Sequence, residues 1–307
     1  MLIKLKNVTH IYNQEHDIRA LDNINLEIDE HEFIGIVGHT GSGKTTLVQM
    51  FNSLIKPTSG DIYVDGIKTT EKKANLKHIR QTVGLVFQYP EHQLFEETIY
   101  DDIAFGPRNL KLDKEEVDKR VKVALDLVGL EFEEFKDRSP FNLSGGQQRR
   151  VAIAGVLAMR PRVLILDEPS AGLDPQGREK LKALLKRLHE SYNITIILIS
   201  HRMEEITQLS SRVIVMDHGK IVLNGSPREV FSYKEKLESL SLELPEITEI
   251  LFRLKERGCD IRTDIFTAEE AVEEIIKVIG SQTDVNWYHN RSICTRWFYC
   301  TYFRSES

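Results

Sequence analysis

The sequence is poor in cysteine: it contains three, and all of them lie in its last fifth. An odd number confined to one end excludes the disulfide framework of a small secreted domain and fits a reducing cytosol. No apolar run approaches the roughly 18–20 residues that a helix needs to cross a bilayer. Residues 1–6 alternate like a strand and lack the continuous apolar core of a signal peptide.

An excess of positive charge is also missing. Lys and Arg number 41 against 47 Asp and Glu, which gives a net charge of −6. This balance disfavours a bulk-basic nucleic-acid binder, and no nucleic acid is expected among the partners. Hydrophobic residues make up 41% of the 307 positions, which is enough for a large core and too much for a disordered chain. The length fits one large domain with an appendage.

What the sequence does contain is a series of short apolar runs separated by polar helices. Residues 33–37 and 163–166 are continuous apolar runs, the pattern of strands buried on both faces of a parallel sheet. Residues 2–8 alternate in part, as a strand with one buried face does. Further strands are predicted at 83–87 and 194–199, hairpins at 61–67 and 213–223, and helices at 114–128 and 177–190. The fold class is therefore α/β, with a mostly parallel core sheet and an antiparallel β part near the N-terminus.

The composition changes near residue 227, and a helical appendage is expected over residues 228–280. Thr267 and Glu270 have the spacing of a capping box, which opens a helix that Gly280 is placed to end. This helix is expected to bury one face, made of Val272, Ile275, Ile276 and Ile279.

A glycine-rich segment between a buried strand and an amphipathic helix matches the pattern G-x-x-x-x-G-K-[ST]. Its glycines let backbone N–H groups curl around phosphate oxygens at a helix N-terminus. Lys44 is expected to reach the β- and γ-phosphates of ATP, and the Thr45 hydroxyl is expected to ligate Mg²⁺. The following helix is expected to bury Leu47, Met50, Phe51 and Leu54 on one face. The predicted nucleotide-binding residues here are Gly38, His39, Thr40, Gly41, Ser42, Gly43, Lys44, Thr45 and Thr46.

A second anion-binding helix start is predicted at Ser144, Gly145, Gly146 and Gln147, which follow Leu143. Taken alone, this segment is equally well explained as an ordinary serine cap after a loop. Beside the phosphate loop, however, Leu-Ser-Gly-Gly-Gln resembles the signature motif of ABC-type ATPases, in which it accompanies a Walker A loop. The resemblance implies that this motif contacts ATP bound to a partner subunit.

The resemblance extends to the acidic end of the strand at 163–166. It implies that Asp167 is the acid on the Mg²⁺ side and that Glu168 polarises the attacking water. Without the family, the pair would be interpreted as a solvated turn. Asp174 looks like the aspartate of the D-loop along the dimer seam, and His201 resembles the switch histidine that touches the γ-phosphate.

Two weaker matches complete the expected site. Gln88 follows the strand at 83–87 and looks like the Q-loop glutamine, which senses Mg²⁺ and contacts the membrane partner. Tyr12 occupies the place of the aromatic residue that stacks on adenine, although an aromatic residue at the end of a first strand is commonly a packing residue. The resemblance covers residues 1–227 as an ABC ATP-binding domain, with its helical signature part at about residues 89–160.

Residues 87–98 and 101–107 resemble the energy-coupling factor importers, the family also called CbiO-like. The segment Tyr-Pro-Glu-His-Gln-Leu-Phe resembles the corresponding segment in the second of the two paralogous ATPases that many such importers contain. In this family the segment around Gln93 forms a groove for the coupling helices of a transmembrane T subunit, and we expect Gln93 and Leu94 to line it. A solvated loop with a short helix is the alternative for this segment.

The resemblance implies an ATPase that is peripheral on the cytoplasmic face of the cell membrane, with ATP and Mg²⁺ as cofactors. Its partners would be a second ABC ATPase in a heterodimer or homodimer, the T subunit and a substrate-binding S subunit. The C-terminal appendage would contribute dimer contacts. The transported vitamin or transition-metal ion is chosen by the S subunit and cannot be identified from this chain. The alternatives are the ATPase of another ABC importer and a non-transport ABC ATPase for iron–sulfur assembly or cell division.

The last segment, residues 281–307, departs from this family. Residues 287–307 hold both tryptophans and two of the three cysteines and show little periodicity. A non-native or frame-altered end is favoured over a membrane-surface segment. Cys294 and Cys300 have only His289 beside them, so no metal site is assigned there.

Overall fold

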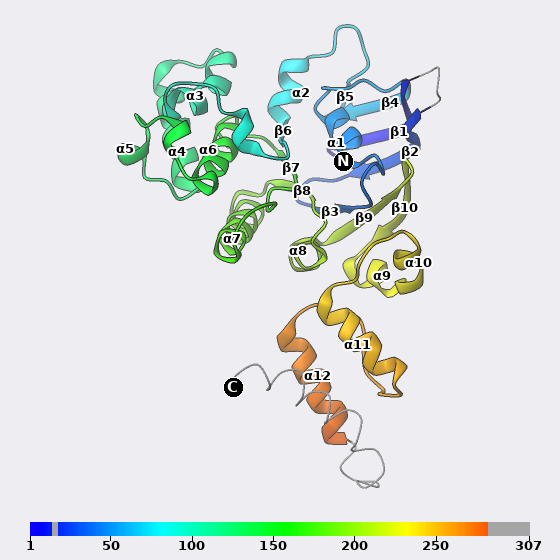
Figure 1. Cartoon of the computed structure of the whole chain (residues 1–307). Helices are drawn as coiled ribbons and strands as arrows, with labels where there is room; N and C mark the ends of the chain where they lie inside the picture. Colours follow the sequence, from blue (N-terminus) through cyan, green and yellow to red (C-terminus); the bar gives the residue numbers. More distant parts are fainter. Residues whose placement is uncertain (14–17, 282–307) are drawn as a thin grey trace.

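The computed structural model describes residues 1–13 and 18–281, which form two sheets flanked by helices. The larger sheet has six strands in the order β10-β9-β3-β8-β7-β6, and the smaller has four in the order β2-β1-β4-β5. Figure 1 shows the smaller sheet on one side of the molecule and helices α3 to α6 on the other. The region predicted as a tail lies outside the described residues from 282 onward.

The larger sheet is the parallel core sheet that the apolar runs predict. Five of its strands run parallel, and β10 pairs antiparallel with β9 at one edge. Ile34 and Ile36 face the smaller sheet, whereas Phe33 and Val37 face the helices, so both faces are buried. Its strands are β3 (Phe33–Val37), β6 (Val83–Val86), β7 (Val163–Asp167), β8 (Thr195–Ile199), β9 (Arg212–Asp217) and β10 (Lys220–Gly225).

The smaller sheet is the predicted antiparallel part near the N-terminus. It consists of β1 (Ile3–Asn13), β2 (Ile18–Ile28), β4 (Ser59–Val64) and β5 (Ile67–Lys68). The hairpin of β4 and β5 turns at Asp65 and Gly66, both of which have positive φ angles, as a tight hairpin requires. Helix α1 (Lys44–Phe51) packs between the two sheets, which confirms its predicted buried face at Leu47, Met50 and Phe51.

The prediction for α1 was wrong at its end. Leu54 lies beyond the helix and is 48% exposed. The helix stops because Ser53 adopts a left-handed φ of 57°, and the Leu54 N–H is then shared by the Asn52 side chain and the Gln49 carbonyl. An apolar residue at helical spacing therefore does not show that the backbone is still helical at that position.

Helix α2 (Leu76–Thr82) packs on the same face of the core sheet as α1, because its buried Ile79 belongs to the core that contains Ile34 and Ile36. The other helices before β9 cover the opposite face, and α3 to α6 form the helical part (Figure 1). Their apolar residues share one core with the strands, as the amphipathic pattern of residues 114–128 predicts. They are η1 (Pro90–Gln93), α3 (Ile99–Asn109), α4 (Lys114–Leu127), α5 (Phe132–Phe135), η2 (Pro140–Asn142), α6 (Gly145–Leu157), α7 (Pro175–Tyr192) and α8 (Met203–Leu209).

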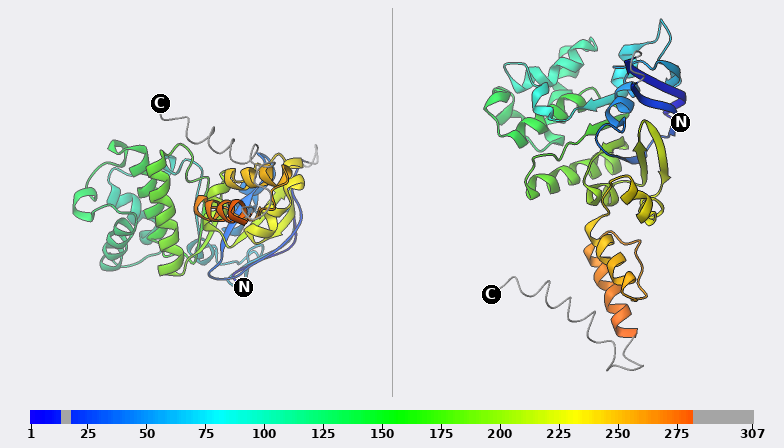
Figure 2. Two further views of the ribbon diagram at one scale, coloured as in Figure 1. Left: turned by 90° about the horizontal axis from the view of Figure 1, so that it is seen from below. Right: turned by 45° about the vertical axis from the view of Figure 1, so that its right-hand side comes forward.

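Four helices follow the sheet: α9 (Pro227–Ser232), α10 (Lys234–Ser239), α11 (Glu246–Glu256) and α12 (Ala268–Ser281). Figure 2 shows α11 and α12 side by side, projecting away from the sheets. They enclose a small core of their own, made of Leu251, Ile261, Ile265 and Ala271. The Glu270 N–H bonds to the Thr267 hydroxyl at 3.3 Å, so the predicted cap is present.

The predicted buried face of α12 was wrong in part. Ile275 packs against the small core, but Val272 is 47% exposed and Ile276 is 64% exposed. Ala271, one position before Val272, is 5% exposed and belongs to the small core, so the buried face of the helix begins one residue earlier than predicted. Gly280 does not end the helix, which continues to Ser281.

Candidate functional site

Polar residues gather where the parallel strands end. The register aligns Val86 of β6 with Leu166 of β7, and Asp167 with Ile199 of β8. The segments after these strands therefore meet at one edge of the sheet, where open α/β sheets bind ligands. This edge carries Gly38 after β3, Gln88 after β6, Asp167 and Glu168 at the end of β7, and His201 after β8.

The loop over residues 38–45 has a backbone that only glycine fits at two points. Gly38 has φ +155°, and a Cβ added there would lie 2.3 Å from the Met216 carbonyl oxygen. Gly43 has φ +103° and caps α1, and a Cβ there would lie 2.4 Å from the Ala20 carbonyl oxygen. The loop is consequently packed against the backbone of neighbouring strands, and its N–H groups lie at the start of helix α1.

Lys44 is buried within this loop. Its Nζ donates to the carbonyl oxygens of Gly38 at 2.6 Å and His39 at 2.9 Å. Burial lowers the pKa of the Lys44 ammonium, and the charges of Glu168 and Asp167 oppose this effect. The Ser42 hydroxyl is buried without a hydrogen-bond partner among the described residues. A mobile cation and an unsatisfied hydroxyl in a glycine loop fit a polyphosphate.

The two acids after β7 differ in their partners. Asp167 is buried, and its Oδ2 accepts a hydrogen bond from the Thr45 hydroxyl at 2.7 Å. Burial raises the pKa of the Asp167 carboxyl, while the bond from Thr45 lowers it. A carboxylate and a hydroxyl side by side form an oxygen donor set of the kind that Mg²⁺ prefers.

Glu168 lies 2.7 Å from His201, measured from Oε1 to Nε2. Its φ is 51°, a left-handed conformation that costs a residue with a side chain about 1–3 kcal/mol. Its N–H donates to the Ile199 carbonyl at 2.9 Å, which holds the residue in that conformation. Burial raises the pKa of the Glu168 carboxyl, against the charge of His201. Such local strain is typical of a functional position.

Two buried charged residues connect this edge to its neighbours, and the sequence patterns did not indicate either. Glu205 accepts hydrogen bonds from Ser170 at 2.8 Å and Ser200 at 3.1 Å, which links the segments after β7 and β8. Arg149 of α6 donates to the carbonyls of Pro169 at 2.8 Å and Ala171 at 2.7 Å. Each residue stands beside other polar residues in the sequence, where a charge is usually solvated, so spacing gave no signal.

The signature residues lie apart from the phosphate loop. Ser144 caps α6 in a capping box: its N–H donates to the Gln147 Oε1 at 3.1 Å, and the Gln147 N–H donates back to its hydroxyl at 3.4 Å. A cavity of about 510 Å³ beside them is lined by Ser144, Gly146, Gln147 and Asp174, and by no residue of the phosphate loop. Asp174 is exposed and caps α7 through the Gly177 N–H at 2.6 Å. Figure 1 shows α6 and α1 in different parts of the molecule.

Tyr12 and Gln88 lie near the site with exposed side chains. Tyr12 is 58% exposed, and its hydroxyl is 3.1 Å from that of Thr46 on α1. Gln88 is exposed at the edge formed by the strand ends. No contact that the structure records for the described residues joins it to Asp167, so its predicted role stays a prediction.

The prediction that Leu94 lines a partner groove was wrong. Leu94 is 8% exposed and belongs to the core of the helical part, because the turn of η1 directs it inward. Gln93 is half-buried. Two aromatic residues of this segment are exposed: Tyr89 by 47% and Phe95 by 57%. Phe95 packs edge-on against Phe105 of α3, with ring centroids 5.0 Å apart.

Comparisons with known proteins agree with this geometry. A profile described as ABC transporter matches residues 21–171. The energy-coupling factor transporter ATP-binding protein EcfA2 of Clostridium tetani is 54% identical over 92% of this chain and 99% of that protein. In Caldanaerobacter subterraneus, the protein EcfA2 is 53% identical over 93% of this chain and 100% of its own length, and EcfA1 is 47% identical over 90% and 99%.

Solved structures agree as well. CbiO1 from Clostridium perfringens, described as part of the ABC transporter complex CbiONQ, is similar with a TM-score of 0.68 and 41% identity. The match covers 82% of this chain and 98% of that one. A dimeric ATP-binding cassette, solved in a post-hydrolysis state with ADP and phosphate, has a TM-score of 0.66 and 36% identity over 73% of this chain and 98% of its own.

The raised pKa of Asp167 predicts how the stability of the nucleotide-free chain depends on pH. The Asp167 carboxyl stays protonated to a higher pH in the folded chain than in the unfolded chain, where its pKa is near 3.8. Stability is therefore lost as pH rises from that value through the folded pKa. We expect Asp167→Asn to raise the unfolding midpoint relative to wild type near neutral pH and to have little effect below about pH 4.

The measurement is thermal unfolding without nucleotide at a series of pH values. Asp65→Asn is the matched control of opposite sign, because the hydrogen bond from His78 lowers the pKa of Asp65. It should destabilise the chain at neutral pH, and this loss should shrink as pH falls through the folded pKa. A difference between Asp167→Asn and wild type that does not grow with pH would contradict the prediction.

Proposed function

The chain belongs to the family of energy-coupling factor transporter ATP-binding proteins, and we propose that it couples ATP binding and hydrolysis to uptake of a vitamin or a metal ion through a membrane complex. The observation that carries this proposal is the edge where the strands end. There the phosphate loop, the Thr45–Asp167 bond and the Glu168–His201 pair lie together. Such a set of groups fits transfer of a phosphoryl group to water.

The phosphate loop binds the nucleotide in this proposal. Backbone N–H groups of residues 38–45 receive the phosphates, and Lys44 moves from the carbonyls of Gly38 and His39 to the β- and γ-phosphates. Tyr12 stacks on the adenine from its exposed place beside Thr46.

Mg²⁺ would be held by the Thr45 hydroxyl and Asp167, with Gln88 as a further oxygen ligand. When bound, this ion neutralises charge that develops on the β- and γ-phosphate oxygens. The short bond between Thr45 and Asp167 already places two of these oxygens side by side. Their arrangement supports the assignment.

Glu168 acts on the attacking water in this proposal. Its left-handed backbone turns the carboxyl away from the strand direction, and His201 holds Oε1 at 2.7 Å. The carboxylate accepts a hydrogen bond from the water and orients it toward the γ-phosphate. A raised pKa brings Glu168 closer to neutral pH, which suits a group that receives a proton.

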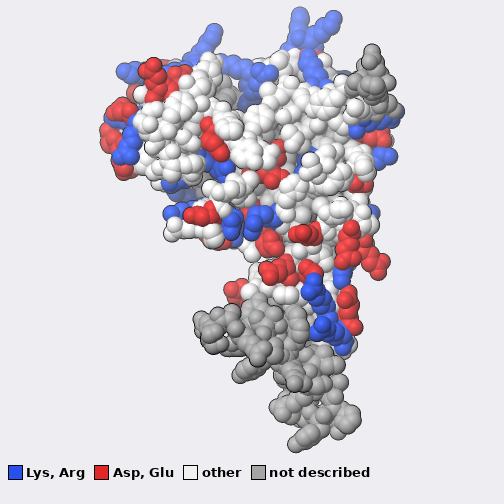
Figure 3. Space-filling model, viewed as in Figure 1, with Lys and Arg blue, Asp and Glu red and all other residues white. Residues whose placement is uncertain are grey.

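A second ATPase chain completes the site. The exposed Ser144–Gln147 helix start closes over the γ-phosphate bound by the partner, and Asp174 lies along the seam. We assign residues 1–227 to the ABC domain and 228–280 to dimer contacts, for which the exposed Val272 and Ile276 offer apolar surface. In the view of Figure 3, uncharged surface covers much of the upper part of the molecule, with some acidic and basic side chains within it and many at its edges. The partner is a paralogue or a second copy of this chain. This chain is more similar to EcfA2 than to EcfA1, which supports its assignment as the second of the two paralogues.

The membrane partners are a transmembrane T subunit and a substrate-binding S subunit. Among the described residues, no helix combines the length and apolar character that crossing a membrane requires. A peripheral position on the cytoplasmic face is therefore reached through the T subunit. We assign its docking to the exposed aromatic pair of Phe95 and Phe105. Aromatic anchors in a shallow surface are typical of helix docking.

Glu168→Gln should bind MgATP with the affinity of wild type, since the phosphate loop and Asp167 are untouched. Its turnover should fall by about 10²–10⁴, because an amide cannot take the proton of water. Phosphate release and nucleotide calorimetry measure the two effects. Glu179→Gln on the exposed surface of α7 is the control and should resemble wild type. Near-normal turnover by Glu168→Gln would remove this residue from the proposed role.

Phe95→Asp should reduce capture of the T subunit by about tenfold or more, because it places a charge in the proposed apolar contact. Phe95 is exposed, so nucleotide affinity and folding should be unchanged. A pull-down with the purified T subunit beside an ATP-binding assay measures both. Tyr192→Asp changes another exposed aromatic residue, on α7, which is 45% exposed, and should capture the T subunit normally. Equal capture by Phe95→Asp and Tyr192→Asp would place the docking surface elsewhere.

A further inference from the structure

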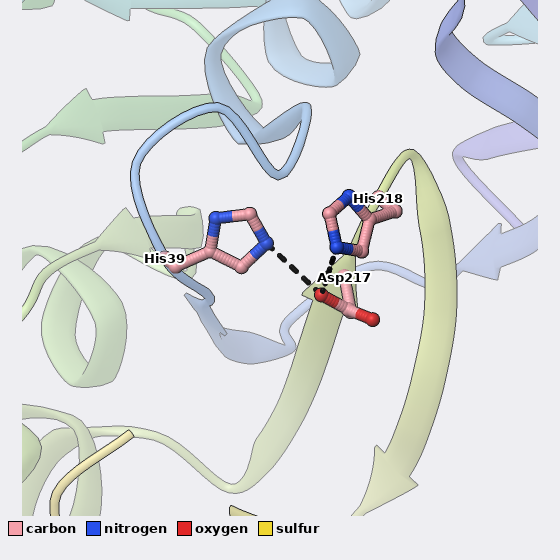
Figure 4. A group of neighbouring side chains, drawn as sticks. All are labelled: His39, Asp217 and His218. Carbon is pink, nitrogen blue, oxygen red and sulfur yellow. Dashed lines mark hydrogen bonds and ion pairs between the residues drawn. The ribbon is translucent and has the colours of Figure 1, made fainter. Parts of the chain in front are cut away.

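Three potential metal ligands meet beside the phosphate loop, apart from the acids after β7. His39 lies in the loop itself, Asp217 ends β9, and His218 begins the turn to β10. Figure 4 shows both imidazole rings directed toward the Asp217 carboxylate. The ligand atoms of the three side chains all lie within 4.8 Å of one another, and this is the one such group among residues 1–13 and 18–281.

The hydrogen bonds of His39 determine where its proton lies. Its Nδ1 is 2.8 Å from the Thr40 carbonyl oxygen, which can only accept, so Nδ1 carries a hydrogen. Its Nε2 is 2.9 Å from Oδ1 of Asp217, which as a carboxylate oxygen also only accepts. A neutral imidazole would therefore place two lone pairs against each other. The contact requires either one further proton shared by Nε2 and Oδ1 or a metal ion bound to both atoms.

His218 favours the metal ion. Its Nε2 lies 3.7 Å from the same Asp217 oxygen, and its ring centroid is 5.1 Å from that of His39. A shared proton would involve only His39 and Asp217, and the imidazole of His218 would have no part in it. A metal ion uses all three, and two imidazoles with a carboxylate are a ligand set typical of Zn²⁺. The His218 side chain is 84% exposed, so it can rotate to shorten the remaining ligand distances without disturbing the core.

The backbone already holds the two segments together. The Gly219 N–H donates to the Ser42 carbonyl at 3.0 Å, so the β9–β10 turn is bonded to the phosphate loop. Gly38 lies against the Met216 carbonyl, where no side chain would fit. Ligands on two such fixed segments are pre-organised for an ion between them.

We propose that His39, Asp217 and His218 form a transition-metal site, suited best to Zn²⁺, that fastens the β9–β10 turn to the phosphate loop. The Thr40 carbonyl supplies the outer hydrogen bond that orients a ligating imidazole through its second nitrogen. Three protein ligands leave one position for water. Lys44 bonds to the His39 carbonyl, so an ion at this site is linked to the residue that must move to receive phosphate. The inference is independent of the proposed transport function, because it concerns the chain without nucleotide.

Zinc binding to the full nucleotide-free chain tests the site. We expect His218→Ala to lose one equivalent of Zn²⁺ in a calorimetric titration, or to bind that equivalent about tenfold or more weakly. The matched control is His78→Ala, because His78 Nε2 pairs with Asp65 Oδ2 at 2.8 Å but belongs to no three-ligand group in the described part of the chain. It should bind zinc as wild type does. Any zinc bound by residues outside the described part would be the same in wild type and in both variants, so it does not affect the difference between them.

Two further readouts separate a metal ion from a proton. With Co²⁺, wild type and His78→Ala should show the visible absorption of a tetrahedral site, and His218→Ala should not. Zn²⁺ should also slow hydrogen exchange of the Gly219 amide in wild type and leave it unchanged in His218→Ala. Equal zinc stoichiometry and affinity in wild type and His218→Ala would overturn the proposal and leave a protonated His39 paired with Asp217. Unchanged exchange of the Gly219 amide in zinc-bound wild type would overturn the fastening of the turn to the loop.

Discussion

Burial of opposite charges at the carboxyl edge of the parallel sheet is the constraint on which the rest of the site depends. Lys44 and Asp167 are both buried there, beside Glu168. Burial lowers the pKa of Lys44 and raises the pKa of both acids, because it disfavours the charged form of each group. Without a ligand, keeping these groups charged therefore costs free energy of folding. The glycine loop and the strained Glu168 backbone are further costs of the same kind. Bound MgATP would offset these costs, and this explains why such a site persists.

The same edge also bears on the proposal that two chains form the complete site. Its parallel strands bring the phosphate loop, the acids and His201 together, but α6 begins in the helical part, and the cavity beside Ser144 is lined by no residue of the phosphate loop. Arg149 fixes α6 to the segment after β7 through two backbone carbonyls. In the proposed function, a movement of the helical part would reach the residues beside Glu168 through Arg149. It would reach the exposed rings of Phe95 and Phe105 through η1. Nucleotide and membrane partner would be linked in this way.

The sequence predicted those features whose signal is local. The apolar runs identified the parallel strands, and the spacing of Gly38, Lys44 and Thr45 identified the phosphate loop together with its strand and helix. Leu54 and the face of α12 were predicted wrongly, because periodicity does not show where a backbone turns or which of two adjacent positions is buried. Leu94 was predicted wrongly from the family resemblance, because a resemblance in sequence does not show in which direction a side chain points. Arg149, Glu205 and the contact of His39 with Asp217 were not predictable, because they join segments far apart in the sequence. Only the fold brings them together.

Retention of nucleotide tests the shared site most directly. Glu168→Gln, prepared with the ATPase chain it pairs with, is incubated with MgATP and desalted rapidly, and the bound nucleotide is counted. We expect stable retention, and we expect that adding Ser144→Arg to every chain abolishes it while MgATP still binds reversibly to each phosphate loop. Ser144 is exposed, so the change should cost the fold only the N-cap of α6, about 0.5–2 kcal/mol. Undiminished retention with Ser144→Arg would show that one chain suffices and would contradict the shared site.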